Sequence, residues 1–332
     1  MSTLSWNCRG LGNPRTVREV TDLVSRKKPE FVFLMETKVG WLHAERLRVK
    51  LGFDGLFYVD NDGMAGGLAL LWKKNNTARL LSYSKNHVDV EVSSANGKVW
   101  RMTCFCGQSD RNMRTESWDL LLTLSTRSQL PWIVMGDFND LLYQHEKRGG
   151  NPHRNNLLRW FGEVIDGCAL TQLPMSGYRF TWEMGEGTDM WIEERLDKVL
   201  ATDRWHDMNG DAGVENIRTR NSDHLTLFLR IDVANVTRNR PRGFRFEMAC
   251  LLDEGCREVV ETAWQDGRTE GLLDCQQYCG HRLMRWGGDH FHNFGDRIKR
   301  LRERQEQIRS RRDPAALAEF QHIETQLRQL EV

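Results

Sequence analysis

The sequence lacks any long apolar run and any marked excess of charge of one sign. No segment of its 332 residues reaches the roughly 18 apolar residues that a membrane-spanning helix needs, so we expect no membrane partner. Lysine and arginine (47) nearly balance aspartate and glutamate (46). The net charge of +1 therefore does not indicate any class of binding partner. Internal repeats and low-complexity tracts are also absent, which excludes a repeat architecture.

The cysteines of the sequence do not show the pattern of a disulfide-bonded framework. The eight cysteines are scattered through a chain too large to need disulfide staples, and no apolar signal stretch precedes them. Half of a zinc-binding pattern is present in Cys275, Cys279 and His281. The sequence contains no second pair of cysteine or histidine ligands at a matching spacing to complete the site. We therefore favour free thiols in a reducing, intracellular compartment over disulfides or a zinc site.

Short apolar runs alternate with amphipathic stretches in the first two thirds of the chain. Strands are predicted at 4–7, 31–35, 68–72, 80–84, 178–182, 195–201 and 225–231, and helices at 16–26, 41–51, 115–124 and 155–168. The stretch HVDVEVSSANGKVWRMTCF alternates Val88, Val90 and Val92, turns near Asn96-Gly97 and predicts a β-hairpin. Mixed strands with helices between them favour sheets packed face to face with helices outside.

The character of the sequence changes after Asp232. The segment RNRPRGFRF is basic, contains proline and glycine, and predicts a linker at residues 233–246. The chain is long enough for one sandwich of about 200 to 250 residues with an appendage. We therefore divide it into a domain at 1–232, the linker, and a helical extension at 247–332.

The extension shows helical periodicity and one strongly basic run. Asp313-Pro314 resembles a helix N-cap followed by proline, and the apolar stripes on either side include Ile308 and Phe320. The run Arg297–Arg312 holds eight basic and two acidic residues. Such a run is either a footprint for nucleic acid or the solvated face of a helix, and we favour the solvated face.

The segment PWIVMGDFND ends an apolar run on a glycine, a carboxylate and an amide. Residues 133–135 have the pattern of a strand covered on both faces. Asp137 and Asn139, two residues apart, lie on the same side of the chain, and Gly136 lets a ligand or another backbone approach. Such a place suits a phosphate and a metal. An Asp/Asn turn that closes a strand is the alternative.

Four more segments place polar residues at strand ends. They are SWNCRG with Asn7, FLMETK with Glu36, ERLDKVL with Asp197, and NSDHLTLFL with Asp223 and His224. Taken singly, each is explained as well by a surface turn, an ion pair or the start of a strand. Taken together, the acids, amides and imidazole suit metal-assisted hydrolysis of a phosphodiester.

Several motifs occur in a specific order between Leu4 and about Ile231. They are LSWNCRGLGNP, FLMETK, GGLALLW, PWIVMGDFND, EKRGG, YRFTW, ERLDKVL and SDH. In this order they resemble the endonuclease/exonuclease/phosphatase superfamily, and more closely the endonuclease region of plant LINE-type non-LTR retrotransposons. FRFEMACLLDEGC and LMRWGGDHFHNFGDRI resemble the segment that joins nuclease to reverse transcriptase in those elements.

The resemblance implies a fold, a cofactor and a partner. The implied fold is α+β, a four-layer α/β/β/α sandwich of two mixed sheets with helices outside, followed by the helical extension. Glu36 is the implied principal metal ligand, with Asn7 and Asp223 beside it. The implied metal is Mg²⁺, with Mn²⁺ as the alternative, because magnesium takes oxygen ligands and needs few carboxylates. The implied partner is nuclear DNA, and no small-molecule cofactor or protein partner is indicated.

The same resemblance implies catalytic roles. Asp137 positions or deprotonates the attacking water, and Asn139 holds a phosphate oxygen with its amide. His224 stabilises the negative charge that develops on phosphorus, and Asp197 fixes the tautomer and orientation of His224. The implied product is a nick with a 3′-hydroxyl and a 5′-phosphate.

Substrate contacts are implied for Thr181 and Trp182 in YRFTW and for the position of Cys106. The resembling elements usually read GFYG there, with a tyrosine that reaches the phosphate, whereas this chain reads CFCG. A thiol is shorter and a weaker donor than a phenol. Losing a hydrogen bond to a charged group costs about 1.5 to 3 kcal/mol, so turnover should be roughly tenfold to hundredfold slower. Cys104 and Cys106 point in parallel from one strand, so we expect no disulfide between them.

Three functions remain open at this point. The leading interpretation is a magnesium-dependent DNA endonuclease. A second keeps the fold but cleaves small phosphoesters, and a third is a catalytically decayed nucleic-acid-binding remnant. The ordered motifs favour the endonuclease, and the cysteine at the tyrosine position is what keeps the remnant in consideration.

Overall fold

The computed structural model describes residues 1–62, 65–94, 96–231, 254–268 and 271–330. The chain forms two compact units, Met1–Glu186 with Met190–Val236 and Gly187–Asp189 with Thr237–Val332. We call them the sandwich unit and the helical unit. The linker predicted at 233–246 lies outside the described residues, so the domain division made from the sequence stays a prediction.

Two large mixed sheets form the sandwich unit, in the strand orders β11-β15-β16-β1-β2-β4-β3 and β10-β14-β8-β7-β6-β5. The first sheet contains β1 (Ser2–Asn7), β2 (Phe31–Met35), β3 (Gly55–Asp62), β4 (Ala65–Trp72), β11 (Met175–Gly177), β15 (Gly213–Ile217) and β16 (Thr226–Arg230). The second contains β5 (Ala78–Ser84), β6 (His87–Ser93), β7 (Val99–Cys106), β8 (Trp132–Asp137), β10 (Thr171–Gln172) and β14 (Asp197–Ala201). A small third sheet joins β12 (Trp182–Met184), β13 (Ile192–Glu194) and β9 (Lys147–Arg148).

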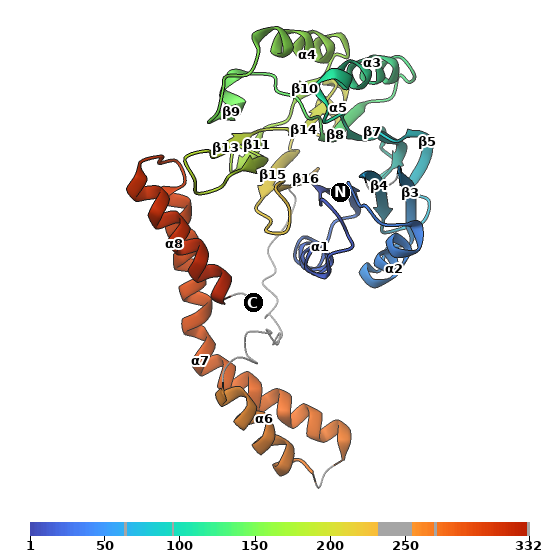
Figure 1. Cartoon of the computed structure of the whole chain (residues 1–332). Coiled ribbons are helices and arrows are strands. Elements are labelled where there is room, and N and C mark those ends of the chain that lie inside the picture. The colour runs from blue at the N-terminus through green and yellow to red at the C-terminus, as the bar shows by residue number, and fades with distance from the viewer. Residues whose placement is uncertain (63–64, 95, 232–253, 269–270, 331–332) are drawn as a thin grey trace. The chain divides into compact units, whose positions relative to one another are not determined.

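Helices cover the outer faces of the two large sheets (Figure 1). α1 (Pro14–Lys27) and α2 (Trp41–Leu51) pack on the first sheet, and α3 (Arg114–Ser125) and α4 (Asn155–Gly167) pack on the second. The short helix α5 (Asp203–Met208) follows β14. The fold is therefore the predicted α+β sandwich of four layers, α/β/β/α.

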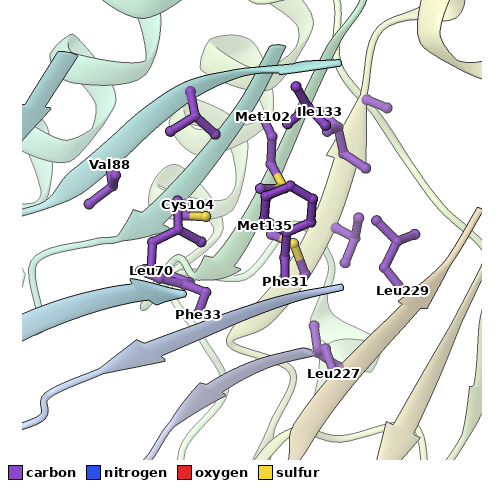
Figure 2. Close-up of a cluster of buried hydrophobic side chains, with 14 of the residues drawn as sticks. Phe31, Phe33, Leu70, Val88, Met102, Cys104, Ile133, Met135, Leu227 and Leu229 are labelled. Carbon is purple, nitrogen blue, oxygen red and sulfur yellow. The ribbon is translucent and has the colours of Figure 1, made fainter. Parts of the chain in front are cut away.

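The apolar core explains why the central strands read as unbroken apolar runs. In β2, Phe31 and Phe33 point into the core between the sheets, whereas Val32 points to the layer under α1. In β8, Ile133 joins the same inner core and Val134 packs under α3 and α4. Figure 2 shows these inner side chains from both sheets meeting face to face. Each central strand is buried on both faces, and its end is thereby fixed rigidly.

Sequence periodicity located most elements but misplaced one strand. Only the last residue of the strand predicted at 178–182 is in regular structure, as the start of β12. The residues before it are tied by single contacts, since Asn216 donates its amide to the carbonyl oxygens of Tyr178 and Phe180 at 2.6 and 2.8 Å. The aromatic alternation there reflects burial in an extended segment rather than membership of a ladder.

The helical unit is built from α6 (Glu254–Asp266), α7 (Leu272–Ile308) and α8 (Pro314–Leu330). The predicted cap is confirmed, because Asp313 Oδ1 accepts a hydrogen bond of 3.0 Å from the Ala316 N–H. Phe320 and Leu327 of α8 are buried, as their stripe predicts. None of the described helices carries a stretch apolar enough to cross a bilayer.

Part of the basic run packs within the helical unit. Arg304 forms a two-point hydrogen-bonded pair with Glu319 at 2.6 and 3.0 Å. Arg309 is 2% exposed and lies over the Phe320 ring, 6.0 Å from its centroid. These arginines join α7 to α8, which weakens the interpretation of the run as a footprint for nucleic acid.

The sandwich unit is expected to lose stability in mild acid through His87. This side chain is buried on β6 between Ser82 and Ser84, whose hydroxyls lie 3.0 and 2.8 Å from its two ring nitrogens. Burial lowers the pKa of His87 to about 4. The unfolded chain, with a histidine pKa near 6.5, binds more protons between these values, so stability is complete above about pH 6.5 and falls towards pH 4.

The measurement is urea unfolding of the wild type and His87→Gln at pH 7, 6 and 5. The wild type should lose about 2 kcal/mol more than the variant as the pH falls from 7 to 5. The difference between the two proteins removes the contribution of the carboxylates, which titrate in both. Parallel pH curves would show that His87 does not titrate as its burial implies.

Candidate active site

Five polar side chains from separate strands meet at one rim of the sandwich. Asn7 ends β1 and Glu36 follows β2, and the parallel pairing of Asn7 with Met35 brings these two ends together. Asp137 ends β8 in the other sheet, and Asp197 starts β14 directly opposite it in antiparallel register. His224 lies two residues before β16. The structure therefore brings these five candidate residues together.

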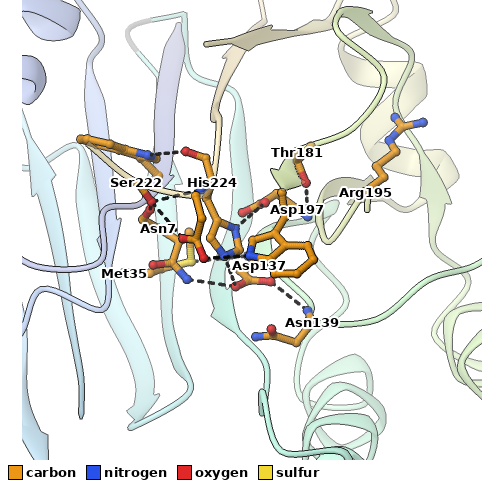
Figure 3. Close-up of polar contacts among 12 residues, drawn as sticks. Asn7, Met35, Asp137, Asn139, Thr181, Arg195, Asp197, Ser222 and His224 are labelled. Carbon is orange, nitrogen blue, oxygen red and sulfur yellow. Dashed lines mark hydrogen bonds and ion pairs between the residues drawn. The ribbon is translucent and has the colours of Figure 1, made fainter. Parts of the chain in front are cut away.

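Asn7 connects the two sheets within this cluster. The side chain is fully buried, and its amide nitrogen donates to Glu36 Oε1 at 3.0 Å. The same nitrogen donates to Asp137 Oδ2, also at 3.0 Å (Figure 3). One amide therefore fixes a carboxylate from each sheet at a set separation. This geometry needs an amide donor, because an aspartate at the same place would add a third negative charge.

His224 is oriented from its far side by Asp197. Its Nδ1 lies 2.9 Å from Asp197 Oδ2, and its Nε2 lies 3.7 Å from Asp137 Oδ2. All three side chains are at most 2% exposed. The hydroxyl of the buried Thr181 accepts the backbone N–H of Asp197 at 2.8 Å and so fixes the start of β14. The ring has one defined orientation, with Nε2 directed at Asp137.

The charges of this group follow from its burial and its close packing. Burial raises the pKa of Asp137 to about 6, and the neighbouring Asp197 carboxylate adds to the rise while His224 opposes it. Burial alone would lower the pKa of His224, but Asp197 and Asp137 outweigh it and raise the pKa to about 9. Between these values, Asp137 is ionised and His224 is protonated.

The segment around Gly136 shows why a glycine precedes the buried acid. Gly136 has φ of +138°, and a Cβ there would lie 2.0 Å from the Phe105 carbonyl oxygen on β7. The close approach is therefore by another backbone and not by a ligand. Asp137 Oδ1 accepts the Asn139 N–H at 2.9 Å, so the turn considered as an alternative is present. The same carboxylate closes the turn and lies in the polar cluster.

A second group of charges borders the first. Glu36 and Asp223 both accept hydrogen bonds from the Arg9 guanidinium, and Trp182 donates its indole N–H to Asp223 Oδ2 at 2.9 Å. Burial opposes ionisation of Glu36, but the Asn7 amide and Arg9 lower its pKa below the usual value. Sequence reasoning missed Arg9, although it lies in the WNCRG motif. Its only signal was its position two residues after Asn7.

Two predicted substrate contacts are already engaged within the protein. The Asn139 amide donates to the Gly107 carbonyl oxygen at 3.0 Å, and the Thr181 hydroxyl is bonded to the Asp197 backbone. The structure brings both residues to the cluster. Their contacts with substrate stay predictions.

The sequence model of the Endonuclease/Exonuclease/phosphatase family matches residues 4–224, more than half of the chain. The chain belongs to this family. The match contains all five residues of the cluster, and it ends at His224.

Several solved structures share the fold of this family member at low identity. The 3′-5′ exonuclease NExo from Neisseria meningitidis is 17% identical, with a TM-score of 0.54 over 70% of this chain and 100% of that one. An AP endonuclease from Archaeoglobus fulgidus is 14% identical, with a TM-score of 0.52 over 70% and 100%. The endonuclease domain of TRAS1, a telomere-specific non-LTR retrotransposon, is 14% identical, with a TM-score of 0.50 over 70% and 99%. No curated protein matches the chain. At these identities the likeness shows the fold alone.

Cys106 lies beside the polar cluster of this family member. It pairs in parallel register with Asp137, and its thiol pKa is raised well above the usual value, mainly by burial and then by Asp137 and Glu36. The thiol is therefore neutral and is no nucleophile. Cys104 and Cys106 form no disulfide, as predicted.

Two neighbouring groups offer donors for a metal ion. The predicted set of Glu36, Asn7 and Asp223 supplies only oxygen ligands, and the space between its carboxylates already attracts a cationic side chain. These residues fit a hard divalent cation. Among the described residues, the one group of three histidine, cysteine or acidic side chains whose ligand atoms lie within 4.8 Å of one another is a different one: Asp137, Asp197 and His224. A protonated imidazole has no free lone pair, so this second group is better suited to holding a proton.

Proposed function

We propose that this chain is a metal-dependent phosphodiester hydrolase that nicks DNA, related to the endonucleases of plant LINE-type retrotransposons. The observation that carries the proposal is the buried pair of Asp137 and protonated His224, held by Asn7 and Asp197 at the rim of this fold. Membership of the family and the ordered motifs support the reaction class. DNA as substrate implies that the protein acts in the nucleus.

Asp137 is the group that handles the proton of the attacking water. It is ionised above about pH 6 and its Oδ2 faces His224 Nε2. A water hydrogen-bonded to this carboxylate gives up one proton to it as its oxygen attacks phosphorus. The Asn7 amide and the Asn139 N–H hold the two carboxylate oxygens so that their direction is set before substrate arrives.

His224 is the group that meets negative charge. As an imidazolium it donates from Nε2 to a non-bridging phosphate oxygen, whose negative charge grows as the water oxygen adds to phosphorus. When the P–O3′ bond breaks, its electron pair goes to O3′, which takes a proton from solvent water to become the 3′-hydroxyl, while Asp137 returns the proton it accepted to solvent. Asp197 keeps the ring charged and oriented. A divalent cation held by Glu36, Asn7 and Asp223, with Mg²⁺ as first choice and Mn²⁺ as second, would supply further neutralisation of the phosphate. The products are a 3′-hydroxyl and a 5′-phosphate.

The test is nicking of supercoiled plasmid DNA by the purified chain, with Mg²⁺ and with added chelator. The proposal expects conversion to the open circle that stops with chelator. Glu36→Ala should behave like the wild type with chelator, because the principal ligand is lost. Hydrolysis of small phosphoesters without nicking would favour the second enzyme class, and DNA binding without either reaction would favour the decayed remnant.

Replacing Cys106 by tyrosine is expected to raise nicking by roughly tenfold or more. Cys106 lies opposite Asp137, and a phenol there reaches a phosphate oxygen that the neutral thiol does not span. Initial nicking rates of the wild type and the variant check this. The matched control is Cys106→Phe, which fills the same space without a donor. Equal rates for tyrosine and phenylalanine would show that hydrogen bonding is not what this position lacks.

A further inference from the structure

The Arg9 guanidinium spans the two carboxylates of the predicted metal set. Its Nη1 donates to both Glu36 oxygens at 3.0 Å. Its Nε and Nη2 donate to Asp223 Oδ1 and Oδ2 at 2.9 and 3.0 Å. All four carboxylate oxygens therefore accept from this one side chain. The two-point contact with Asp223 is the arrangement in which an arginine binds a carboxylate most strongly.

The local charges explain why a cation lies there. Glu36 and Asp223 are 16% and 35% exposed at their side chains, so solvent screens their repulsion only in part. Lys38 contacts the same Glu36, with Nζ 3.2 Å from Oε2, but it reaches one carboxylate only. Arg9 alone among the described residues bridges both acids. It neutralises the pair when no other cation does.

A divalent cation needs the oxygens that Arg9 uses. A cation bound to both carboxylates and a guanidinium between them would place like charges within a few ångströms, which is strongly unfavourable. The two therefore exchange instead of binding together. Arg9 is 38% exposed at its side chain, so it can leave towards solvent without opening the core.

The backbone holds this arrangement under strain. Arg9 has φ of +54° and Glu36 has φ of +50°, which is a left-handed backbone conformation that residues other than glycine seldom adopt. Both residues follow the last residues of paired parallel strands by one or two positions. The kinks direct the two side chains towards one another across the strand ends.

We propose that Arg9 is a resident counter-ion of the metal site, which competes with the divalent cation and is displaced when that cation binds. The proposal rests on the metal set of the proposed function. It predicts that Arg9 weakens cation binding while it stabilises the metal-free protein. Removing it should therefore tighten binding of Mg²⁺, the opposite of what removing a supporting residue does.

The experiment measures Mg²⁺ affinity without any nicking assay. Tb³⁺ bound at Asp223 lies beside the Trp182 indole, which can sensitise its luminescence, and Mg²⁺ affinity follows from competition against Tb³⁺. Arg9→Ala should bind Mg²⁺ about tenfold or more tightly than the wild type, the equivalent of one hydrogen-bonded charged contact. Arg9→Lys keeps the positive charge but not the guanidinium that bonds to two oxygens at once. Its Mg²⁺ affinity should therefore lie between those of the wild type and Arg9→Ala.

The matched control is Arg79→Ala. Arg79 also forms a two-point pair with a carboxylate, Glu91, at 3.2 and 2.8 Å, but this pair joins β5 to β6 and contains no residue of the metal set. Its removal takes away the same charge and should leave Mg²⁺ affinity unchanged. An equal gain in both variants would mean that net charge and not local competition sets the affinity, and would overturn the proposal.

A second readout is thermal unfolding in chelator and in Mg²⁺. Arg9→Ala should melt below the wild type in chelator, since its two carboxylates lose their shared cation, and Mg²⁺ should raise its melting temperature more than that of the wild type. Unchanged or weaker Mg²⁺ affinity in Arg9→Ala and in Arg9→Lys overturns the exchange. If affinity changes as expected while no variant nicks DNA, the exchange stands and the proposed function falls.

Discussion

Replacing Asp137 by asparagine is expected to reduce chelator-sensitive nicking by about 10²- to 10⁴-fold, because the change removes the group that accepts the proton of the attacking water. The substitution keeps the size of the side chain but replaces one acceptor oxygen by a donor. That donor would face the Asn7 amide nitrogen or the Asn139 N–H, each now bonded to the carboxylate at about 3 Å. Initial rates of plasmid nicking, normalised to folded protein, check the prediction.

Asp140→Asn is the matched control for this experiment. Asp140 lies three residues further on, is 1% exposed, and is paired with Arg114 at 3.1 Å and with the Trp118 indole N–H at 3.0 Å. It is as buried as Asp137 but takes no part in the cluster. Asp140→Asn should therefore lower the unfolding temperature and leave the nicking rate of folded protein intact. An equal loss of nicking in both variants would mean that stability alone is being measured.

Mg²⁺ affinity separates the two acids that the sequence placed in different roles. Asp137→Asn should still bind Mg²⁺, since the predicted ligand is Glu36, whereas Glu36→Ala should not. Loss of Mg²⁺ binding in Asp137→Asn would show that Asp137 is a metal ligand. It would contradict the assignment of Asp137 as the acceptor of the water proton.

The sequence indicated the candidate residues because each lies at the end or the start of a buried strand. Asp137 ends a run that is apolar on both faces, and Asn7 ends a strand that is buried although Thr3 and Ser5 are polar. Their positions at one rim follow from strand direction and from the fold. The pairing of β8 with β14 could not be predicted from the sequence, because strand register depends on contacts between segments 60 residues apart. For that reason the opposition of Asp137 and Asp197 appears only in the structure, and with it the part of the rise in the Asp137 pKa that Asp197 adds to the effect of burial.

Arg9 and Gly136 show two further limits of sequence reasoning. An arginine in a polar loop is usually solvated, and only the closeness of Glu36 and Asp223 makes Arg9 a bridge between them. The glycine before the acid was correctly read as a point of close approach, but the approaching group is the β7 backbone. Local patterns identify such residues, while their partners are decided by tertiary packing.

Asp197→Asn is expected to lower nicking by about 10²- to 10³-fold at pH 8, the loss that follows removal of one charged donor to a developing oxyanion. Asparagine can still hold the ring of His224 through one hydrogen bond. It no longer supplies the largest of the charges that keep the His224 pKa near 9 against burial. In the variant burial prevails, so the imidazole becomes neutral at a lower pH and has no positive charge to offer the phosphate.

The pH dependence of the nicking rate shows whether Asp197 acts on the charge of His224 or only on the orientation of its ring. In the wild type, nicking needs Asp137 ionised and His224 protonated, so the rate should rise through about pH 6 and fall through about pH 9. In Asp197→Asn the fall should begin at lower pH, and the ratio of wild-type to variant rate should grow between pH 6 and 9. Thr181→Val, which releases the Asp197 backbone but keeps its charge, should lower the rate without moving the fall. A slower Asp197→Asn enzyme whose alkaline fall stays at the wild-type pH would show that Asp197 only orients the ring, and the assignment of His224 as an imidazolium would be wrong.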